Sequence, residues 1–180
     1  MKKALLISDS HGQDQEMISV VEHFSDVSAI FHLGDIGTSE SVLENSARCL
    51  TYVVRGNCDR DYDIPEMRLI DFAGKKILMT HGHRYVDYGG FDSLVYLGEE
   101  NGADVVLFGH IHRPVLAESG SLIVCNPGSI SRPRQYDGFK TFAILTVDDD
   151  GEISIQHYTC DISTLGLPII SEYDIEAADY

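Results

Sequence analysis

The sequence predicts an α/β fold, because buried-type strands and amphipathic helices alternate along most of the chain. Six short apolar runs are rich in Val, Ile, Leu or Phe and lack helical periodicity, as buried strands do. They are Ala4–Ile7, Ala29–Leu33, Thr51–Val54, Ile77–Met79, Val105–Phe108 and Leu122–Val124. Helix-like stretches lie between them, which favours a mainly α/β sheet.

Three helices are expected between these strands. Gln13–Phe24 repeats apolar residues at helical spacing. Ser41 and Glu44 form a capping box that opens a second helix over Val42–Leu50. Asp92 is positioned to cap a third helix, which ends at an Asn-Gly pair nine residues later.

The end of the chain has a different pattern. Thr141–Val147 and Glu152–Tyr158 alternate in polarity and are joined by an Asp/Gly turn, which predicts an antiparallel hairpin. We therefore expect a second sheet packed against the first. One domain is predicted over residues 1–160. Residues 161–180 form an acidic tail that docks on this domain or serves as an oligomer contact.

Composition excludes several classes of protein. The chain has 180 residues and a net charge of -16, which argues against binding long duplex nucleic acid or an anionic membrane. The apolar stretch at the N-terminus is too short for a signal peptide, and no run is long enough to span a membrane. Four scattered cysteines without a Cys-x-x-Cys pair suggest reduced thiols and a cytoplasmic location.

Polar residues follow each predicted strand directly. The segments are Ser8–Gly12, Gly34-Asp35, Arg55–Asp59, Thr80–His83, Gly109–Pro114 and Cys125–Ser129. Five of the eight histidines lie in them, next to glycines and carboxylates. Because sites in α/β proteins form at the carboxyl edge of the sheet, these segments predict one functional site.

The residue types in these segments suit divalent transition metals. Asp, Asn and His without cysteines at ligand spacing favour Mn, Fe, Ni, Co or Zn. Asp9 and His11 are two residues apart, as are His110 and His112, so each pair shares a face of an extended segment. Seven candidate ligands are enough for two ions that share a carboxylate. Two ions about 3.5–4 Å apart stabilise phosphoryl displacement and make hydroxide available at neutral pH.

These motifs resemble the calcineurin-like metallophosphoesterases, in particular their small bacterial and archaeal phosphodiesterase branch. The matching elements are Asp9-x-His11, Gly34-Asp35, Gly56-Asn57-x-Asp59, His81-Gly82-His83 and Gly109-His110-x-His112. The segment Asn126–Ser129 extends the resemblance to about residue 134. The fold that it implies is a four-layer α/β/β/α sandwich of two mixed β-sheets flanked by helices.

The resemblance also implies which residues hold two divalent ions, with Mn expected first. Asp9, His11 and His112 would hold one ion, Asn57, His81 and His110 the other, and Asp35 would bridge them. Asn57, His81 and His110, together with Asp59, are also the residues expected to act in catalysis. Substrate contacts are expected from Cys58, His83 and Arg132.

One position departs from the wider family, which has His where this chain has Cys58. That histidine is thought to protonate the leaving group or to grip the phosphate, with Asp59 orienting it. A thiol with a pKa near 8.5 is a poor replacement for an imidazole. We infer that Cys58 narrows activity toward phosphodiesters or good leaving groups. The smaller branch commonly carries this cysteine.

Simpler interpretations exist for several of these residues. Asp9 could cap a helix, and Asn57 could be a turn residue. His81 and His83 compete for one ligand position, and His81 is favoured because it lies closer to its strand. His83 then contacts the substrate or supports a ligand. Cys58 is expected to be structural or to lie beside the substrate, since the sequence offers no base to make it a nucleophile.

The charges are unevenly distributed. Residues 148–180 hold nine acidic side chains and no Lys or Arg. Six of the 13 basic residues follow the strand-end motifs, namely Arg55, Arg60, Arg84, Arg113, Arg132 and Arg134. Arg132 and Arg134 could contact substrate phosphate or simply be solvated. We expect a cationic pocket on an anionic body, which would admit small phosphodiesters.

The function expected from these observations is a dinuclear metal-dependent phosphodiesterase. A hydroxide held between the ions would attack a small phosphodiester in line. The main alternative is a non-catalytic protein-binding scaffold on the same fold, as the eukaryotic retromer subunit of this family is. That subunit departs from the ligand set, whereas every ligand position is filled here. A phosphomonoesterase is a further alternative, and a homo-oligomer is compatible with the sequence.

Overall fold

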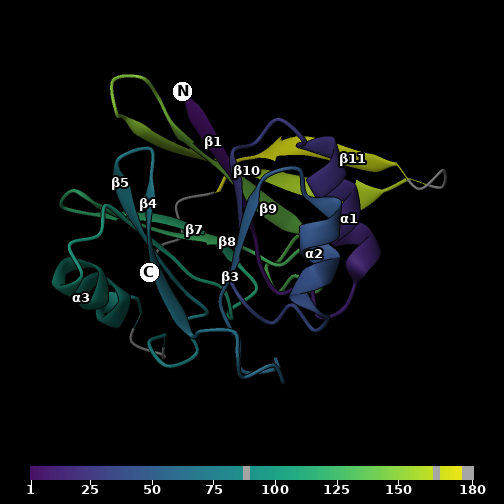
Figure 1. The fold of residues 1–180 in the computed structure, drawn as a ribbon, viewed down its shortest axis with the longest axis horizontal. Coiled ribbons are helices and arrows are strands. Elements are labelled where there is room, and N and C mark those ends of the chain that lie inside the picture. The colour runs from purple at the N-terminus through teal and green to yellow at the C-terminus, as the bar shows by residue number, and fades with distance from the viewer. Residues whose placement is uncertain (87–89, 164–166, 176–180) are drawn as a thin grey trace.

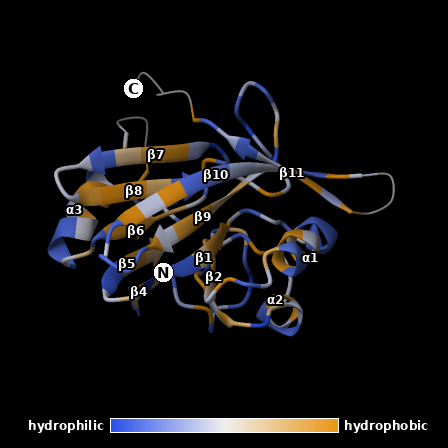
Figure 2. Ribbon diagram, turned by 90° about the horizontal axis from the view of Figure 1, so that it is seen from above, coloured by the Kyte–Doolittle hydropathy of each residue, from blue (hydrophilic) through white to orange (hydrophobic). Residues whose placement is uncertain are grey.

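The computed structural model describes residues 1–86, 90–163 and 167–175. Two β-sheets lie face to face, with helices on both outer faces (Figure 1). Figure 2 shows the layers edge-on: α3 (Asp92–Glu100) covers one sheet, while α1 (Asp14–His23) and α2 (Glu40–Ser46) cover the other. This is the predicted α/β/β/α sandwich of mixed sheets.

The first sheet has six strands in the order β11-β10-β9-β1-β2-β3. Their bounds are β1 Lys2–Ile7, β2 Ala29–His32, β3 Leu50–Val53, β9 Thr141–Val147, β10 Ile153–Ile162 and β11 Pro168–Tyr173. Strands β1, β2 and β3 are parallel, and β9 joins β1 antiparallel. The carboxyl ends of the three parallel strands therefore meet at one edge.

The second sheet has five strands in the order β4-β5-β6-β8-β7. Their bounds are β4 Met67–Phe72, β5 Lys75–Thr80, β6 Val105–Leu107, β7 Pro114–Ser119 and β8 Leu122–Pro127. Strands β5, β6 and β8 are parallel, so their carboxyl ends also share an edge. The two sheets bury one apolar core between them, which includes Leu6, Phe31, Met79 and Leu107.

The predicted hairpin is present as β9 and β10, but it does not belong to the second sheet. It pairs with β1 and extends the first sheet. Strand β9 is buried along nearly its whole length because it lies in the middle of that sheet, so its polarity pattern did not indicate its position. The second sheet is built instead from residues 67–127.

Two of the predicted helix caps are wrong. Helix α2 begins earlier, at Glu40, and its cap is Ser39, whose side chain accepts a hydrogen bond from the Ser41 N–H. It also ends at Ser46, because the next residue is extended and leads into β3. Asp92 lies inside α3 and does not cap it, since the N-cap position is the preceding residue.

Strands β4, β7 and β11 were not predicted. All three lie at sheet edges, where one face stays exposed and polar residues interrupt the apolar pattern. Strand β11 pairs with β10, so part of the acidic segment after residue 160 lies against the sheet. Residues 164–166 and 176–180 of that segment lie outside the described residues. Among the helices of the described chain, none is long and apolar enough to cross a membrane.

Candidate metal centre

The predicted ligand loops have strained backbones. Six non-glycine residues of the described chain have a positive φ, and five of them belong to the predicted metal motifs. These five are Asp9 (54°), His11 (47°), Asp35 (51°), His110 (69°) and His112 (59°). Non-glycine residues rarely adopt this region, and where they do the strain is commonly associated with function. The surrounding structure must therefore hold these loops in place.

Asp9, directly after β1, is held by bonds from several distant segments. Its N–H donates to the Gly34 carbonyl at 3.1 Å, while the hydroxyls of Ser129 and Ser131 donate to its carbonyl at 2.9 and 2.7 Å. One carboxylate oxygen, Oδ2, accepts bonds from the Ser8 hydroxyl at 2.6 Å and the His110 N–H at 3.1 Å. The other oxygen, Oδ1, is left facing the histidines.

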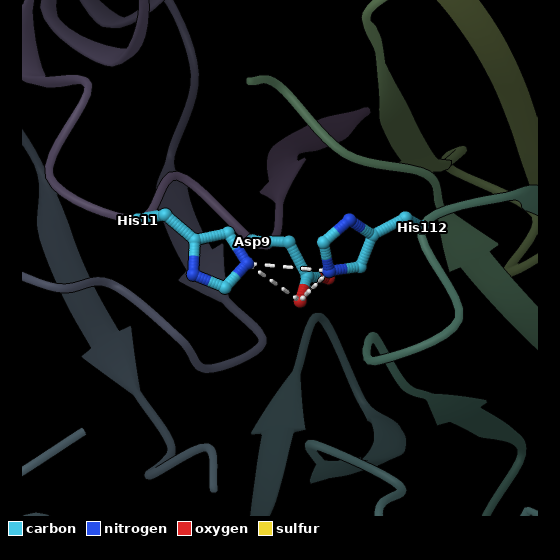
Figure 3. Close-up of side chains that lie close together, drawn as sticks. All are labelled: Asp9, His11 and His112. Atoms are coloured by element: carbon cyan, nitrogen blue, oxygen red, sulfur yellow. Dashed lines mark hydrogen bonds and ion pairs between the residues drawn. The ribbon is translucent and has the colours of Figure 1, made fainter. Parts of the chain in front are cut away.

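Two histidines approach this free oxygen from separate loops (Figure 3). His112 Nε2 lies 3.1 Å from Asp9 Oδ1, and His11 Nε2 lies 3.9 Å from it. The two Nε2 atoms are 3.2 Å apart. Three ligand atoms thus converge on one point, as the first predicted ligand set requires.

A second group shares Asp9 and adds Asp35 and His81. His81 Nε2 lies 3.5 Å from Asp35 Oδ2 and 4.0 Å from Asp9 Oδ1. His11 Nε2 is 3.9 Å from the same Asp35 oxygen. Asp35 therefore lies between the two histidine groups. Its other oxygen accepts the Cys58 N–H at 2.8 Å, which fixes the carboxylate in this place.

Hydrogen bonds to backbone carbonyls determine which ring nitrogens face the centre. His112 Nδ1 donates to the Arg132 carbonyl at 2.6 Å, and His81 Nδ1 donates to the Leu33 carbonyl at 2.7 Å. A carbonyl oxygen only accepts, so Nδ1 carries the proton in both rings. In the neutral rings, the Nε2 lone pairs consequently point at the carboxylates. This is the tautomer that binds metals through Nε2.

Two polar atoms of the centre, Asp9 Oδ1 and His81 Nε2, are buried without a hydrogen-bond partner within the described residues. Burial raises the pKa of Asp9, but His112 and His81 outweigh it, so this pKa is lowered. The pKa of Asp35 is lowered as well, against burial, chiefly by His81. Burial lowers the pKa of His81, but Asp35 and Asp9 outweigh it, so that pKa is raised. Two ionised carboxylates beside imidazole nitrogens suit divalent cations, which bind in place of the imidazole proton.

Asn57 and His110 lie beside this centre, on the wall of a cleft of about 370 Å³. The His110 ring is 5.3 Å from the His81 ring, centroid to centroid, and meets it edge-on. The Asn57 side chain is exposed and donates to the Cys58 sulfur at 3.4 Å. His83 lies 5.5 Å from the His81 ring, and its Nδ1 is buried without a partner. Both Asn57 and His110 thus line the same cleft as His11, Asp35 and His112.

Cys58 opens onto the same cleft. Partial burial and the neighbouring Asp35 carboxylate raise the pKa of this thiol to about 11. It is therefore a neutral thiol near pH 7, which does not readily give up its proton.

Asp59 joins two of the ligand loops through its carboxylate. Its Oδ1 accepts the Gly37 N–H at 3.0 Å, and its Oδ2 accepts the Gly56 N–H at 2.8 Å. Both oxygens are thus used to join the loop after β3 to the loop after Asp35. In this geometry Asp59 acts as a support for the ligand loops.

Several supporting residues were not identified from sequence. Ser129 accepts bonds from two backbone N–H groups while it donates to Asp9. His32, predicted to be packed or surface, is fully buried and bonds Ser10 Oγ at 2.9 Å and the Gly34 N–H at 3.3 Å. The bond from Ser129 to Asp9 and the bond between Ser10 and His32 join residues far apart in the chain, so local sequence patterns could not reveal them. For Ser129, the sequence signal was the position of the segment Asn126–Ser129 directly after a predicted strand.

The six arginines near the motifs divide by location. Arg55 and Arg84 share the carboxylate of Glu66, at 2.5 and 2.8 Å, and neither lines the cleft. Arg132 and Arg134 line the cleft. Among the described residues, these two arginines are thus the ones that bring positive charge to the cleft.

A four-layer sandwich with an Asp/His cluster at the carboxyl edge of its parallel strands defines a metallophosphoesterase class of protein. Residues 1–150 match the model of the calcineurin-like phosphoesterase superfamily domain, and the chain belongs to this family. It is 37% identical over 149 residues to the probable metallophosphoesterase YsnB of Bacillus subtilis, covering 81% of this chain and 85% of that one.

Two further proteins extend the comparison. The chain is 28% identical over 159 residues to the phosphodiesterase YfcE of Escherichia coli, covering 74% of this chain and 82% of that one. A Vps29 structure from Entamoeba histolytica superposes with a TM-score of 0.76 over 97% of this chain and 99% of that chain, at 23% identity. This second likeness concerns the fold alone.

Proposed function

We propose that this metallophosphoesterase is a dinuclear phosphodiesterase that hydrolyses small phosphodiesters, with Mn²⁺ as its preferred ion. The observation that carries this proposal is the convergence of Asp9 Oδ1, Asp35 Oδ2 and His81 Nε2, which lie buried within 4.8 Å of one another. The carboxylates raise the pKa of His81, and a divalent ion bound there would replace that proton as their counter-charge. Similarity to a phosphodiesterase of this family supports the choice of substrate.

The residues present fit two ions. One ion would be held by Asp9, His11 and His112. The other would be held by His81, Asn57 and His110, and Asp35 would be shared by both. Divalent ions in such a site supply Lewis acidity toward phosphoryl oxygens and lower the pKa of bound water. The ligand set accepts several transition metals, and its oxygen and imidazole donors suit Mn²⁺.

The chain's own residues bind and orient the substrate. His110 lines the cleft, where an imidazole can donate to a phosphoryl or leaving-group oxygen, and the His83 ring lies 6.2 Å from the His110 ring. Arg132 lines the same cleft and supplies a cation. Cys58 supplies no readily lost proton, so the site favours diesters and leaving groups that depart without strong acid help. Asp59 acts by positioning the loops rather than by touching substrate.

The experiment is turnover of bis-p-nitrophenyl phosphate and of p-nitrophenyl phosphate with added Mn²⁺. We expect cleavage of the diester to exceed that of the monoester, and we expect Asn57→Ala and His112→Ala each to reduce diester turnover by at least about 100-fold. Diester cleavage that is absent with every divalent ion, or unchanged in both variants, would contradict the assignment.

The alternatives have distinct signatures. A protein-binding scaffold would cleave neither ester with any divalent ion, whether or not it binds metal. A phosphomonoesterase would prefer the monoester in the same assay. A cytoplasmic location, the exclusion of long nucleic acid and a homo-oligomeric state remain parts of the proposal; the four free cysteines fit a reducing compartment.

A further inference from the structure

We propose that Arg132 and Arg134 form a second anion site beside the metal centre, so that the preferred substrate is a phosphodiester carrying an additional anionic group. This inference rests on the proposed phosphodiesterase function. It names the class of substrate that the cleft selects.

The two arginines belong to the same cleft as the ligands. Both side chains line it, on either side of Pro133, together with His11 and His112. Both are exposed to solvent and so are accessible to a ligand that enters. A substrate bound at the metal centre therefore has two guanidinium groups within the same cleft.

Their backbone is fixed against a metal ligand. His112 Nδ1 donates to the Arg132 carbonyl at 2.6 Å, and the Arg134 N–H donates back to the His112 carbonyl at 3.0 Å. The Arg132 N–H donates to Ser129 Oγ at 2.8 Å, and Arg113 Nε donates to the Arg134 carbonyl at 3.1 Å. Proline between the two arginines stiffens the segment further. The backbone of the segment, from which both arginine side chains extend into the cleft region, is thus held against His112.

These charges are not neutralised by the protein. In the described part of the chain, neither Arg132 nor Arg134 forms an ion pair with a carboxylate, whereas Arg55 and Arg84 both reach Glu66. A reacting phosphodiester carries only one negative charge, and the ions of the centre would already face it. The guanidinium groups of Arg132 and Arg134 add two positive charges that this singly charged phosphodiester does not require. A guanidinium pair is well suited to bind a second phosphate or carboxylate by charge-assisted hydrogen bonds.

The test uses two substrates that differ only in a second phosphate. They are the p-nitrophenyl ester of thymidine 5′-phosphate and the same ester with a 3′-phosphate; both release p-nitrophenolate. With the Mn²⁺-loaded enzyme, we expect kcat/KM to be about tenfold higher, or more, for the 3′-phosphorylated ester. Arg132→Gln and Arg134→Gln should each bring this ratio close to one. Arg48→Gln removes the same charge from an exposed residue that does not line the cleft, and should preserve the ratio.

Three results would overturn the proposal. The ratio could be near one in the wild type, or it could survive in both arginine variants. Third, Arg132→Gln or Arg134→Gln could lower kcat/KM by the same factor for the esters with and without the 3′-phosphate. That result would mean that the arginine binds the reacting phosphate and not a second anion. If bis-p-nitrophenyl phosphate is cleaved normally in any of these cases, only the anion site fails. If no diester is cleaved at all, the proposed function fails with it.

Discussion

Removal of the Ser129 hydroxyl is expected to destabilise the ligand loop of Asp9. Ser129 is fully buried, and its Oγ donates to the Asp9 carbonyl at 2.9 Å while it accepts the N–H groups of Arg132 at 2.8 Å and Ser131 at 3.2 Å. Ser129→Ala leaves two N–H donors without this partner, at about 1–3 kcal/mol each when buried. Because both bonds are only partly buried, we expect a loss of about 2–4 kcal/mol in the free energy of unfolding.

A double-mutant cycle with Ser131 isolates the effect on Asp9. Ser131 Oγ also donates to the Asp9 carbonyl, at 2.7 Å. Each single alanine variant leaves that carbonyl one hydroxyl donor, whereas Ser129→Ala/Ser131→Ala leaves none. The double variant should therefore lose about 1–3 kcal/mol more than the sum of the single variants. Mn²⁺ affinity should fall by about 10–100-fold, because Asp9 is no longer held in its strained conformation.

The assay is urea unfolding of the metal-free protein, together with Mn²⁺ titration by calorimetry. Ser46→Ala is the matched control, because its hydroxyl makes one bond, to the Val42 carbonyl at 2.9 Å within α2. It should cost no more than about 1.5 kcal/mol and leave Mn²⁺ binding unchanged. Additive losses in the double variant, or a Ser129→Ala loss below about 0.5 kcal/mol, would show that these hydroxyls do not hold the Asp9 loop.

Three further predictions concern other parts of the molecule. Cys58→His should raise the ratio of monoesterase to diesterase kcat/KM by about tenfold or more, since an imidazole can protonate a leaving group and a thiol of pKa about 11 cannot; an unchanged ratio in the p-nitrophenyl assay would contradict this. Burial lowers the pKa of His157 to about 4, so below pH 6.5 the unfolded chain binds a proton that the native state excludes. The resulting loss in the free energy of unfolding is absent above pH 6.5 and grows to about 3 kcal/mol as the pH falls to 4. Urea unfolding of His157→Gln between these pH values should show a shallower decline than the wild type, and an equal slope would disprove the assignment. Gly109→Ala should abolish Mn²⁺ binding, because a Cβ there would lie 2.9 Å from Asp9 Oδ2, whereas Gly120→Ala, with open space around it, should lose some stability but still bind Mn²⁺ in calorimetry.

The sequence predicted the strands that have continuous apolar runs, the edge strand β3 among them, and missed the edge strands β4, β7 and β11. A strand such as β6 is covered on both faces, so it needs an unbroken apolar run. Strands β4 and β7 expose one face, and their polar residues hide the pattern. The position of β9 could not be predicted either, because long-range pairing with β1, and not local composition, determines it.

The site divides in a similar way. The ligand candidates could be found because they directly follow strands and because their residue types suit metals. The supports could not be found, since Ser129 and Asp9 are 120 residues apart, and His32 bonds a residue 22 positions away. The motif suggested that Asp59 acts in catalysis, but it did not indicate the two backbone N–H groups by which Asp59 supports the ligand loops.

The central claim is that catalysis depends on two ions held by one shared carboxylate. Its most direct test is a stepwise Mn²⁺ titration of the metal-free protein, in which bis-p-nitrophenyl phosphate turnover is measured at each addition. Turnover should be negligible without metal, should rise and saturate at two equivalents of Mn²⁺, and should fail to reach that level in Asp35→Ala. Turnover that is full without added metal, or that saturates at one equivalent, would contradict the account.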